Sequence, residues 1–141
     1  MLRISTQVRY GTRALVQIAG AVPGRAVPVK EIARAQRVSV KYLEHIVSSL
    51  KLAGLIQAVR GTKGGYVLAR PARSVRLDEV VRALEGPPVT GVGADRAEAG
   101  PAGGVWVRIR EAVDGVLASV TLQDLVEESR LRGGAPPSYE I

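Results

Sequence analysis

A cation, a carboxylate and an imidazole share one side of the helix that the sequence predicts after Ser39. At 100° per residue, Lys41, Glu44 and His45 lie together, opposite a run of apolar side chains, and Ser48 extends the strip. These are groups that read base edges in the major groove of DNA. Ser39 can cap the helix and hold a phosphate together with free backbone N–H groups. The alternative is an ordinary amphipathic helix whose polar face meets only solvent.

A second basic cluster stands on a glycine-rich segment. Two β-prone runs flank residues 61–65, which predicts a hairpin with Arg60 at the base of its tip and Lys63 within the tip. Arginine suits a narrow, A·T-rich minor groove, and glycines let the backbone approach a phosphate closely. Tyr66 either hydrogen-bonds a phosphate or packs beneath the hairpin. A nucleotide-binding loop is the competing interpretation, but the spacing Gly-x4-Gly-Lys-Ser/Thr is absent here.

The elements that must position these clusters follow from capping and turn residues. A tight turn at Arg37-Val38 joins two predicted helices, and a basic hairpin follows them, which together are typical of a winged helix-turn-helix. The fold class is therefore mainly α with a small β-hairpin wing. The first predicted helix is capped by Ser5 or Thr6, has Val8, Leu15, Ile18 and Val22 as its apolar positions, and ends at Pro23-Gly24. A helix over 29–36, opened by Pro28, and a helix over 40–53, ended by Gly54, follow it. A hairpin over 55–69 and a helix from Leu77 complete the predicted order.

The chain beyond residue 86 has a different character. Ten of the 14 residues in 91–104 are Gly, Ala or Pro, so we expect a flexible loop over 87–104 between a DNA-binding domain at 1–86 and dimerisation helices at 105–132. We expect an extended tail over 133–141. These helices carry an apolar stripe whose residues are spaced by 3 and 4 positions. Such a stripe either pairs the helix with a second copy of the chain or packs on the chain's own DNA-binding domain. The stripe consists of Trp106, Ile109, Val113, Val116 and Val120, and we expect Leu122, Leu125 and Val126 to continue it.

Composition narrows the class of protein. The chain has 141 residues, no cysteine, one histidine and a net charge of +7. Residues 1–86 carry 15 basic and 5 acidic side chains, whereas residues 87–141 carry 5 and 8. The absence of cysteine excludes disulfides and thiolate-bound clusters, and no nucleophile–base–orienter set points to an enzyme. A ribosomal or RNA-binding protein is the other alternative, but such proteins expose aromatic side chains, which are scarce here.

The same composition suggests where the protein works. No apolar run reaches the ~18–20 residues of a membrane span. The first residues, Met1 to Ser5, lack the apolar region of a secretory signal. We therefore expect a cytoplasmic protein without a membrane partner.

Several short motifs occur in an order that resembles the Rrf-two family of winged-helix transcription regulators, which contains the IscR, NsrR and CymR groups. The resemblance implies a homodimeric bacterial regulator, with the helix after Ser39 in the major groove and Arg60 in the minor groove. Pairing of two copies through the apolar stripe would set the two wings on a pseudo-palindromic operator. The leading hypothesis is a sequence-specific DNA-binding repressor. The motifs are Leu2-Arg3-Ile4-Ser5-Thr6, Lys30-Glu31-Ile32-Ala33, Lys41-Tyr42-Leu43-Glu44, Ala53-Gly54-Leu55, Val59-Arg60-Gly61, Lys63-Gly64-Gly65-Tyr66, Val80 to Pro87 and Thr121-Leu122-Gln123-Asp124-Leu125. The expected DNA contacts are Ser39, Lys41, Tyr42, Glu44, His45, Ser48, Arg60, Thr62, Lys63, Gly64, Gly65 and Tyr66.

The chain departs from the family pattern in two places. Many members carry three cysteines before the Trp106 position and bind an iron–sulfur cluster there, whereas this segment has none. Arg37 also occupies a turn position that is often glycine, so it either adopts a left-handed conformation at a cost of about 1 kcal/mol or the turn differs.

The cysteine-free segment and the stretch from Trp106 to Val113 resemble the CymR group, which controls cysteine metabolism. That resemblance implies O-acetylserine thiol-lyase as a partner that carries the pyridoxal phosphate, while this chain binds no cofactor. The expected contact is the tail, with Ile141 inserted into the enzyme's carboxylate pocket and Tyr139 at its rim. The alternatives are a tail without a partner, and a family member that senses another small molecule or partner.

Overall fold

Helix α1 (Thr6–Ala19) lies at the centre of the computed structural model, which describes residues 4–85 and 103–133. Ser5 caps the helix by accepting a 3.1 Å hydrogen bond from the backbone N–H of Val8. The predicted end at Pro23-Gly24 is wrong: the helix ends at Ala19, and the Val22 side chain is 71% exposed. Gly20 is a poor helix former and Pro23 disfavours the helical conformation of the residue before it, so the helix stops before both.

The two helices of the predicted helix-turn-helix are confirmed as α2 (Val29–Gln36) and α3 (Val40–Leu52). Arg37 joins them with φ 57° and ψ 43°, so the turn keeps its left-handed shape with an arginine in it. Ser39 caps α3 by accepting a 3.1 Å hydrogen bond from the backbone N–H of Tyr42. The apolar side of α3 is buried through Leu43, Ile46, Val47 and Leu50.

The wing is an antiparallel pair of short strands, β1 (Ile56–Val59) and β2 (Gly65–Leu68), in which Ile56 pairs with Leu68 and Val59 with Gly65. A short 3₁₀ turn, η1 (Ala72–Ser74), then leads to helix α4 (Leu77–Glu85). Helix α4 packs on both α1 and α3. The Leu84 side chain lies directly over Gly11, and it would have to shift if residue 11 carried a side chain.

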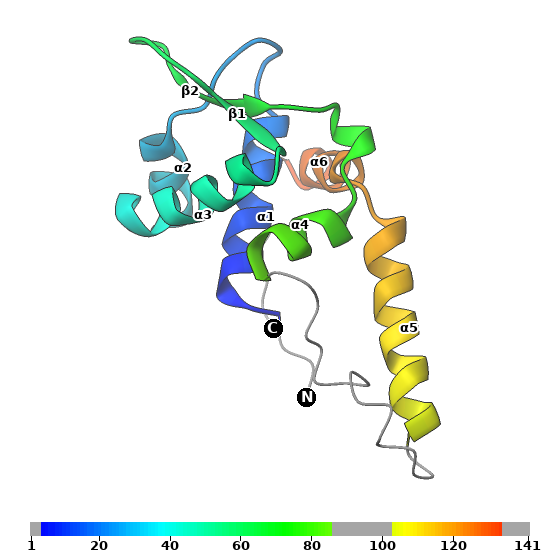
Figure 1. Ribbon diagram of the computed structural model, residues 1–141. Helices are drawn as coiled ribbons and strands as arrows, with labels where there is room; N and C mark the ends of the chain where they lie inside the picture. Colours follow the sequence, from blue (N-terminus) through cyan, green and yellow to red (C-terminus); the bar gives the residue numbers. More distant parts are fainter. Residues whose placement is uncertain (1–3, 86–102, 134–141) are drawn as a thin grey trace.

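Helix α5 (Gly103–Ser119) extends away from the rest of the described chain and packs against α4 (Figure 1). None of its residues is buried. The helix includes Gly103 and Gly104, which the sequence assigned to the flexible loop, and the remainder of that loop, 87–102, lies outside the described residues. No helix among the described ranges is long and apolar enough to cross a membrane.

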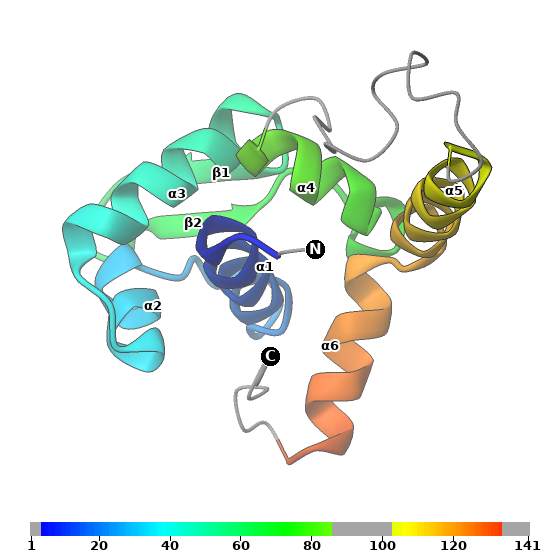
Figure 2. The ribbon, with the colours of Figure 1, turned by 90° about the horizontal axis from the view of Figure 1, so that it is seen from below.

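Helix α6 (Leu122–Leu131) takes a different course from the one predicted. Leu122 and Val126 are buried in the core with α1, so they do not continue the α5 stripe. A new helix starts at the capping box of Thr121, whose hydroxyl accepts from the N–H of Asp124 while the Asp124 carboxylate accepts from the N–H of Thr121. The packing of this helix on α1 then sets its direction. Figure 2 shows α2, α3, α4 and α6 arranged around α1.

Candidate nucleic-acid interface

The polar strip of α3 is exposed along its length. Lys41, Glu44, His45 and Ser48 are all exposed, and each lies on the side opposite the buried apolar residues. Ser39 is exposed at the helix N-terminus as well. The helix therefore presents a cation, a carboxylate and an imidazole to solvent, on a face held rigidly by the core behind it.

Tyr42 lies differently from the other predicted contact residues of α3. It is half-buried, and its ring meets that of Tyr10 edge to face, with 5.9 Å between centroids and 88° between planes. The guanidinium of Arg13 stands 5.8 Å from the Tyr10 ring centre. These contacts anchor α3 on α1, so Tyr42 fixes the position of the polar strip.

The wing carries its basic residues at the tip. Arg60, Thr62 and Lys63 are exposed, whereas Gly64 and Gly65 are half-buried. Tyr66 is half-buried against the core, which favours packing beneath the wing over contact with a phosphate. The backbone of Tyr66 also exchanges hydrogen bonds with Val27, which joins the wing to the segment before α2.

The structure adds one basic residue that sequence reasoning missed. A groove of about 580 Å³ lies between the wing tip and the loop that joins α1 to α2. Arg25 from that loop and Lys63 from the wing both line it, and Arg25 is ion-paired with Glu31 at 2.7 Å. No local signal marks Arg25, because only the pairing of Val27 with Tyr66 brings its loop to the wing.

The wing and α3 lie on one side of the molecule and α5 on the other (Figures 1 and 2). On α5, Trp106 and Val116 are 43% and 59% exposed, and Ile109 and Val113 are half-buried. Val120 is half-buried just beyond the helix end. The tail residues Tyr139 and Ile141 lie outside the described residues.

A helix-turn-helix followed by a basic hairpin defines a winged helix-turn-helix DNA-binding transcription regulator. The chain belongs to the Rrf2 family, described as iron-dependent transcriptional regulators, whose pattern it matches over residues 4–128. Both the fold class and the family expected from the sequence are thus confirmed.

One relative and two solved structures place the chain within the family. CymR of Bacillus subtilis strain 168 is 38% identical over 124 residues, which cover 88% of this chain and 89% of the relative. The structure of CymR, the global cysteine regulator of B. subtilis, has a TM-score of 0.80 at 37% identity and covers 91% and 98% of the two chains. IscR of T. potens has a TM-score of 0.77 at 33% identity, with 91% and 88% covered. The B. subtilis relative is named as a transcriptional regulator.

The iron in the family description does not fit the residues of this chain. The sequence contains no cysteine, so it offers no thiolate to iron, and its single imidazole lies on the exposed face of α3. Within residues 4–85 and 103–133, no three His, Asp or Glu side chains are placed to hold a metal ion.

Proposed function

We propose that the chain is a homodimeric, sequence-specific DNA-binding repressor that acts in the cytoplasm, where bacterial DNA lies. One observation carries the proposal. The exposed polar strip of α3 and the basic wing share one side of the molecule, while an uncovered apolar stripe occupies α5 on the other side. One side is thus chemically suited to DNA and the other to a second copy.

On DNA, α3 enters the major groove and the wing reaches the adjacent minor groove. Lys41, Glu44 and His45 contact base edges. Arg60 enters the minor groove, where narrow A·T-rich steps concentrate negative potential. Phosphates are held around these contacts by Ser39, Ser48, Thr62, Lys63 and the backbone of Gly64 and Gly65. Tyr42 contributes through its contact with Tyr10, and Tyr66 through its place beneath the wing.

The dimer forms through α5. A monomer leaves this helix with no buried residue, although one arc of it carries Val105, Trp106, Ile109, Val113 and Val116. An exposed apolar surface of this size marks a protein interface. Two copies related by a twofold axis bury the arc and present two α3 helices to a pseudo-palindromic site.

The regulated process is cysteine or sulfur metabolism. The support is the similarity to B. subtilis CymR, named as a global cysteine regulator, over 88% of this chain. The corresponding partner is O-acetylserine thiol-lyase, bound through the tail with Tyr139 and Ile141. A family member that senses another small molecule or partner through its C-terminal half is the alternative.

Selection from random double-stranded DNA by the purified protein tests the proposal. We expect enrichment of an inverted repeat whose half-sites are about one or two helical turns apart. The double variant Lys41→Ala/His45→Ala serves as the matched control, because both side chains are exposed and their loss leaves the core intact. Transcription in vitro from a promoter that overlaps the enriched site should fall when the protein is added. A library that stays random, or transcription that rises, would contradict the proposal.

A further inference from the structure

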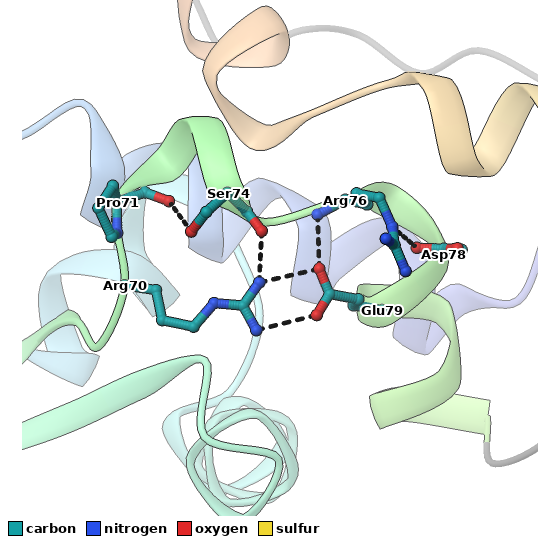
Figure 3. A network of polar contacts seen from close by, with 6 residues as sticks. All are labelled: Arg70, Pro71, Ser74, Arg76, Asp78 and Glu79. Carbon is teal, nitrogen blue, oxygen red and sulfur yellow. Dashed lines mark hydrogen bonds and ion pairs between the residues drawn. The ribbon is translucent and has the colours of Figure 1, made fainter.

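The Arg70 and Glu79 side chains form a two-pronged ion pair at the base of the wing (Figure 3). Arg70 donates from Nη1 and Nη2 to the two carboxylate oxygens of Glu79, each at 2.9 Å, and Nη2 also donates to the carbonyl of Ser74. The same carboxylate accepts a 2.9 Å hydrogen bond from the backbone N–H of Arg76. The Glu79 carboxylate, together with the Arg70 guanidinium, thereby closes residues 70–79, between the end of the wing and the first turn of α4, into a loop.

This loop is where three parts of the molecule meet. At the wing, the N–H of Ala69 donates to Leu55 O at 3.0 Å. At the junction between α5 and α6, Leu77 N donates to Val120 O at 2.9 Å and Leu122 N donates to Val75 O at 2.8 Å. The loop therefore joins the DNA-facing wing to the end of the helix that carries the dimer stripe.

The pair is built to keep its geometry. The Glu79 side chain is only 24% exposed, and a forked arginine–carboxylate contact fixes orientation as well as distance. The hydrogen bonds from Arg70 lower the pKa of Glu79 to about 2, so the carboxylate is ionised throughout the physiological range. By contrast, the pair Arg132–Glu128 lies within one turn of α6 and is more than half exposed on both sides.

The wing and α3 have their own connections, independent of this pair. Val27 and Tyr66 join the wing to the segment before α2, and Leu55 N donates to Leu50 O at the end of α3. Loosening the loop at Arg70 would therefore leave each wing beside its own α3. Helices α4 and α6 would still pack on α1, and what would loosen is the direct link between the wing and the junction of α5 with α6.

We propose that Arg70 and Glu79 are positioning residues that set the distance between the two wings of the dimer, although neither contacts DNA. The inference rests on the proposed function, because it requires a dimer that grips two half-sites. A dimer with loosely placed wings has to order them when it binds both half-sites, whereas binding to one half-site needs no such ordering.

The test uses the full chain with a single spin label at Gln57→Cys, an exposed β1 residue in a sequence without cysteine. Dipolar spectroscopy should give one narrow wing-to-wing distance for the parent and a distribution at least about twice as wide for Glu79→Gln. Arg70→Lys keeps the charge but loses the fork, so it should give an intermediate width. Glu128→Gln, which removes the exposed pair on α6, is the matched control and should leave the distance unchanged.

Binding to the selected DNA, measured with unlabelled protein, provides the second measurement. Glu79→Gln should bind the full inverted repeat about tenfold more weakly and a single half-site with unchanged affinity. Equal loss on both DNAs would mean that the pair only supports the fold, and would overturn the inference. An unchanged distance distribution in folded Glu79→Gln would overturn it too, while the dimer would stand. A parent protein without wing-to-wing coupling would refute the dimer and the inference together.

Discussion

Val27 and Tyr66 exchange two backbone hydrogen bonds, N–H to O in both directions and each 2.9 Å long. This single bridge attaches the wing to the segment before α2, and with it brings Arg25 beside Lys63. Gly65 lies at the same point with φ +156°, and a Cβ there would overlap the carbonyl group of Val27. The wing can lie this close to the helix-turn-helix because residue 65 has no side chain.

Gly65→Ala should detach the wing from the Val27 segment. We expect a loss of about 1–3 kcal/mol in the free energy of unfolding, because the overlap is with backbone atoms that cannot rotate away. Gly115→Ala is the matched control: its Cβ meets nothing within 4 Å and it lies inside α5, so it should be neutral or stabilising by up to about 1 kcal/mol. Urea unfolding measures the free energy of unfolding of both variants. Equal values for the two would contradict the close approach of residue 65 to Val27.

Base-contacting and phosphate-contacting residues should respond differently to substitution. Lys41→Ala should cost about 1–3 kcal/mol of binding and relax the preference at one base pair. Lys63→Ala should weaken all sequences alike and reduce the salt slope by about one. Arg130→Ala, an exposed cation on α6, is the control. Affinity titrations at several salt concentrations check this, and unchanged operator affinity in both Lys41→Ala and Arg60→Ala would refute the proposed docking.

A charge on the α5 stripe should separate the protomers. Val116→Glu places a carboxylate in the apolar arc, and we expect a monomer at micromolar concentration because an unpaired buried charge disfavours association. Ala118→Glu adds the same charge at an exposed position on the other side of the helix and should leave the dimer intact. Sedimentation velocity distinguishes the two, and a monomeric parent protein would exclude the dimer.

The Arg70–Glu79 pair should stabilise the fold only above acidic pH. The folded pKa of Glu79 is about 2, against 4.5 for the free side chain. A lowered folded pKa gives stability that is present above the unfolded value and is lost as pH falls from about 4.5 towards 2. Glu79→Gln should therefore lower the free energy of unfolding by about 1 kcal/mol at pH 6, and the difference between the parent and the variant should be smaller at pH 3. Urea unfolding at both pH values measures this difference, and a difference that does not change with pH would show that the carboxylate's charge is not involved.

The proposed contact of the tail with thiol-lyase can be tested on Ile141 alone. Deleting Ile141, or adding one glycine after it, should abolish binding to the cognate O-acetylserine thiol-lyase because a carboxylate pocket reads the terminal group. O-acetylserine should compete with the intact protein. Calorimetric titration checks both expectations, and Tyr139→Ala should weaken binding less. If both variants bind as tightly as the intact protein, or if the intact protein does not bind, this partner is removed and the DNA proposal is untouched.

The parts of the fold that sequence reasoning predicted correctly are those with local signals. Ser39 caps α3, Gly54 follows its end, and glycines flank the tip of the wing, so the helix-turn-helix and hairpin could be located within a residue or two. The polar strip of α3 was equally predictable, since helical periodicity alone puts Lys41 and Glu44 on the same side.

The features that sequence reasoning missed depend on contacts between distant residues. The direction of α6 is set by packing of Val126 on α1, although its spacing also fits the α5 stripe. Arg25 reaches the wing only through the Val27 bridge. Arg70 and Glu79 are nine residues apart, a separation with no helical or strand periodicity, so nothing in the sequence pairs them.

If the proposed dimer forms through α5, the stability of the protein depends on its own concentration. An isolated helix of 17 residues is marginal in water, and no residue of α5 is fully buried within one chain. In the proposed dimer, its folding free energy therefore comes from association, and by mass action the melting temperature rises with protein concentration. An operator that holds two copies together has the same effect as a higher protein concentration, so binding to DNA would also stabilise the folded state of α5.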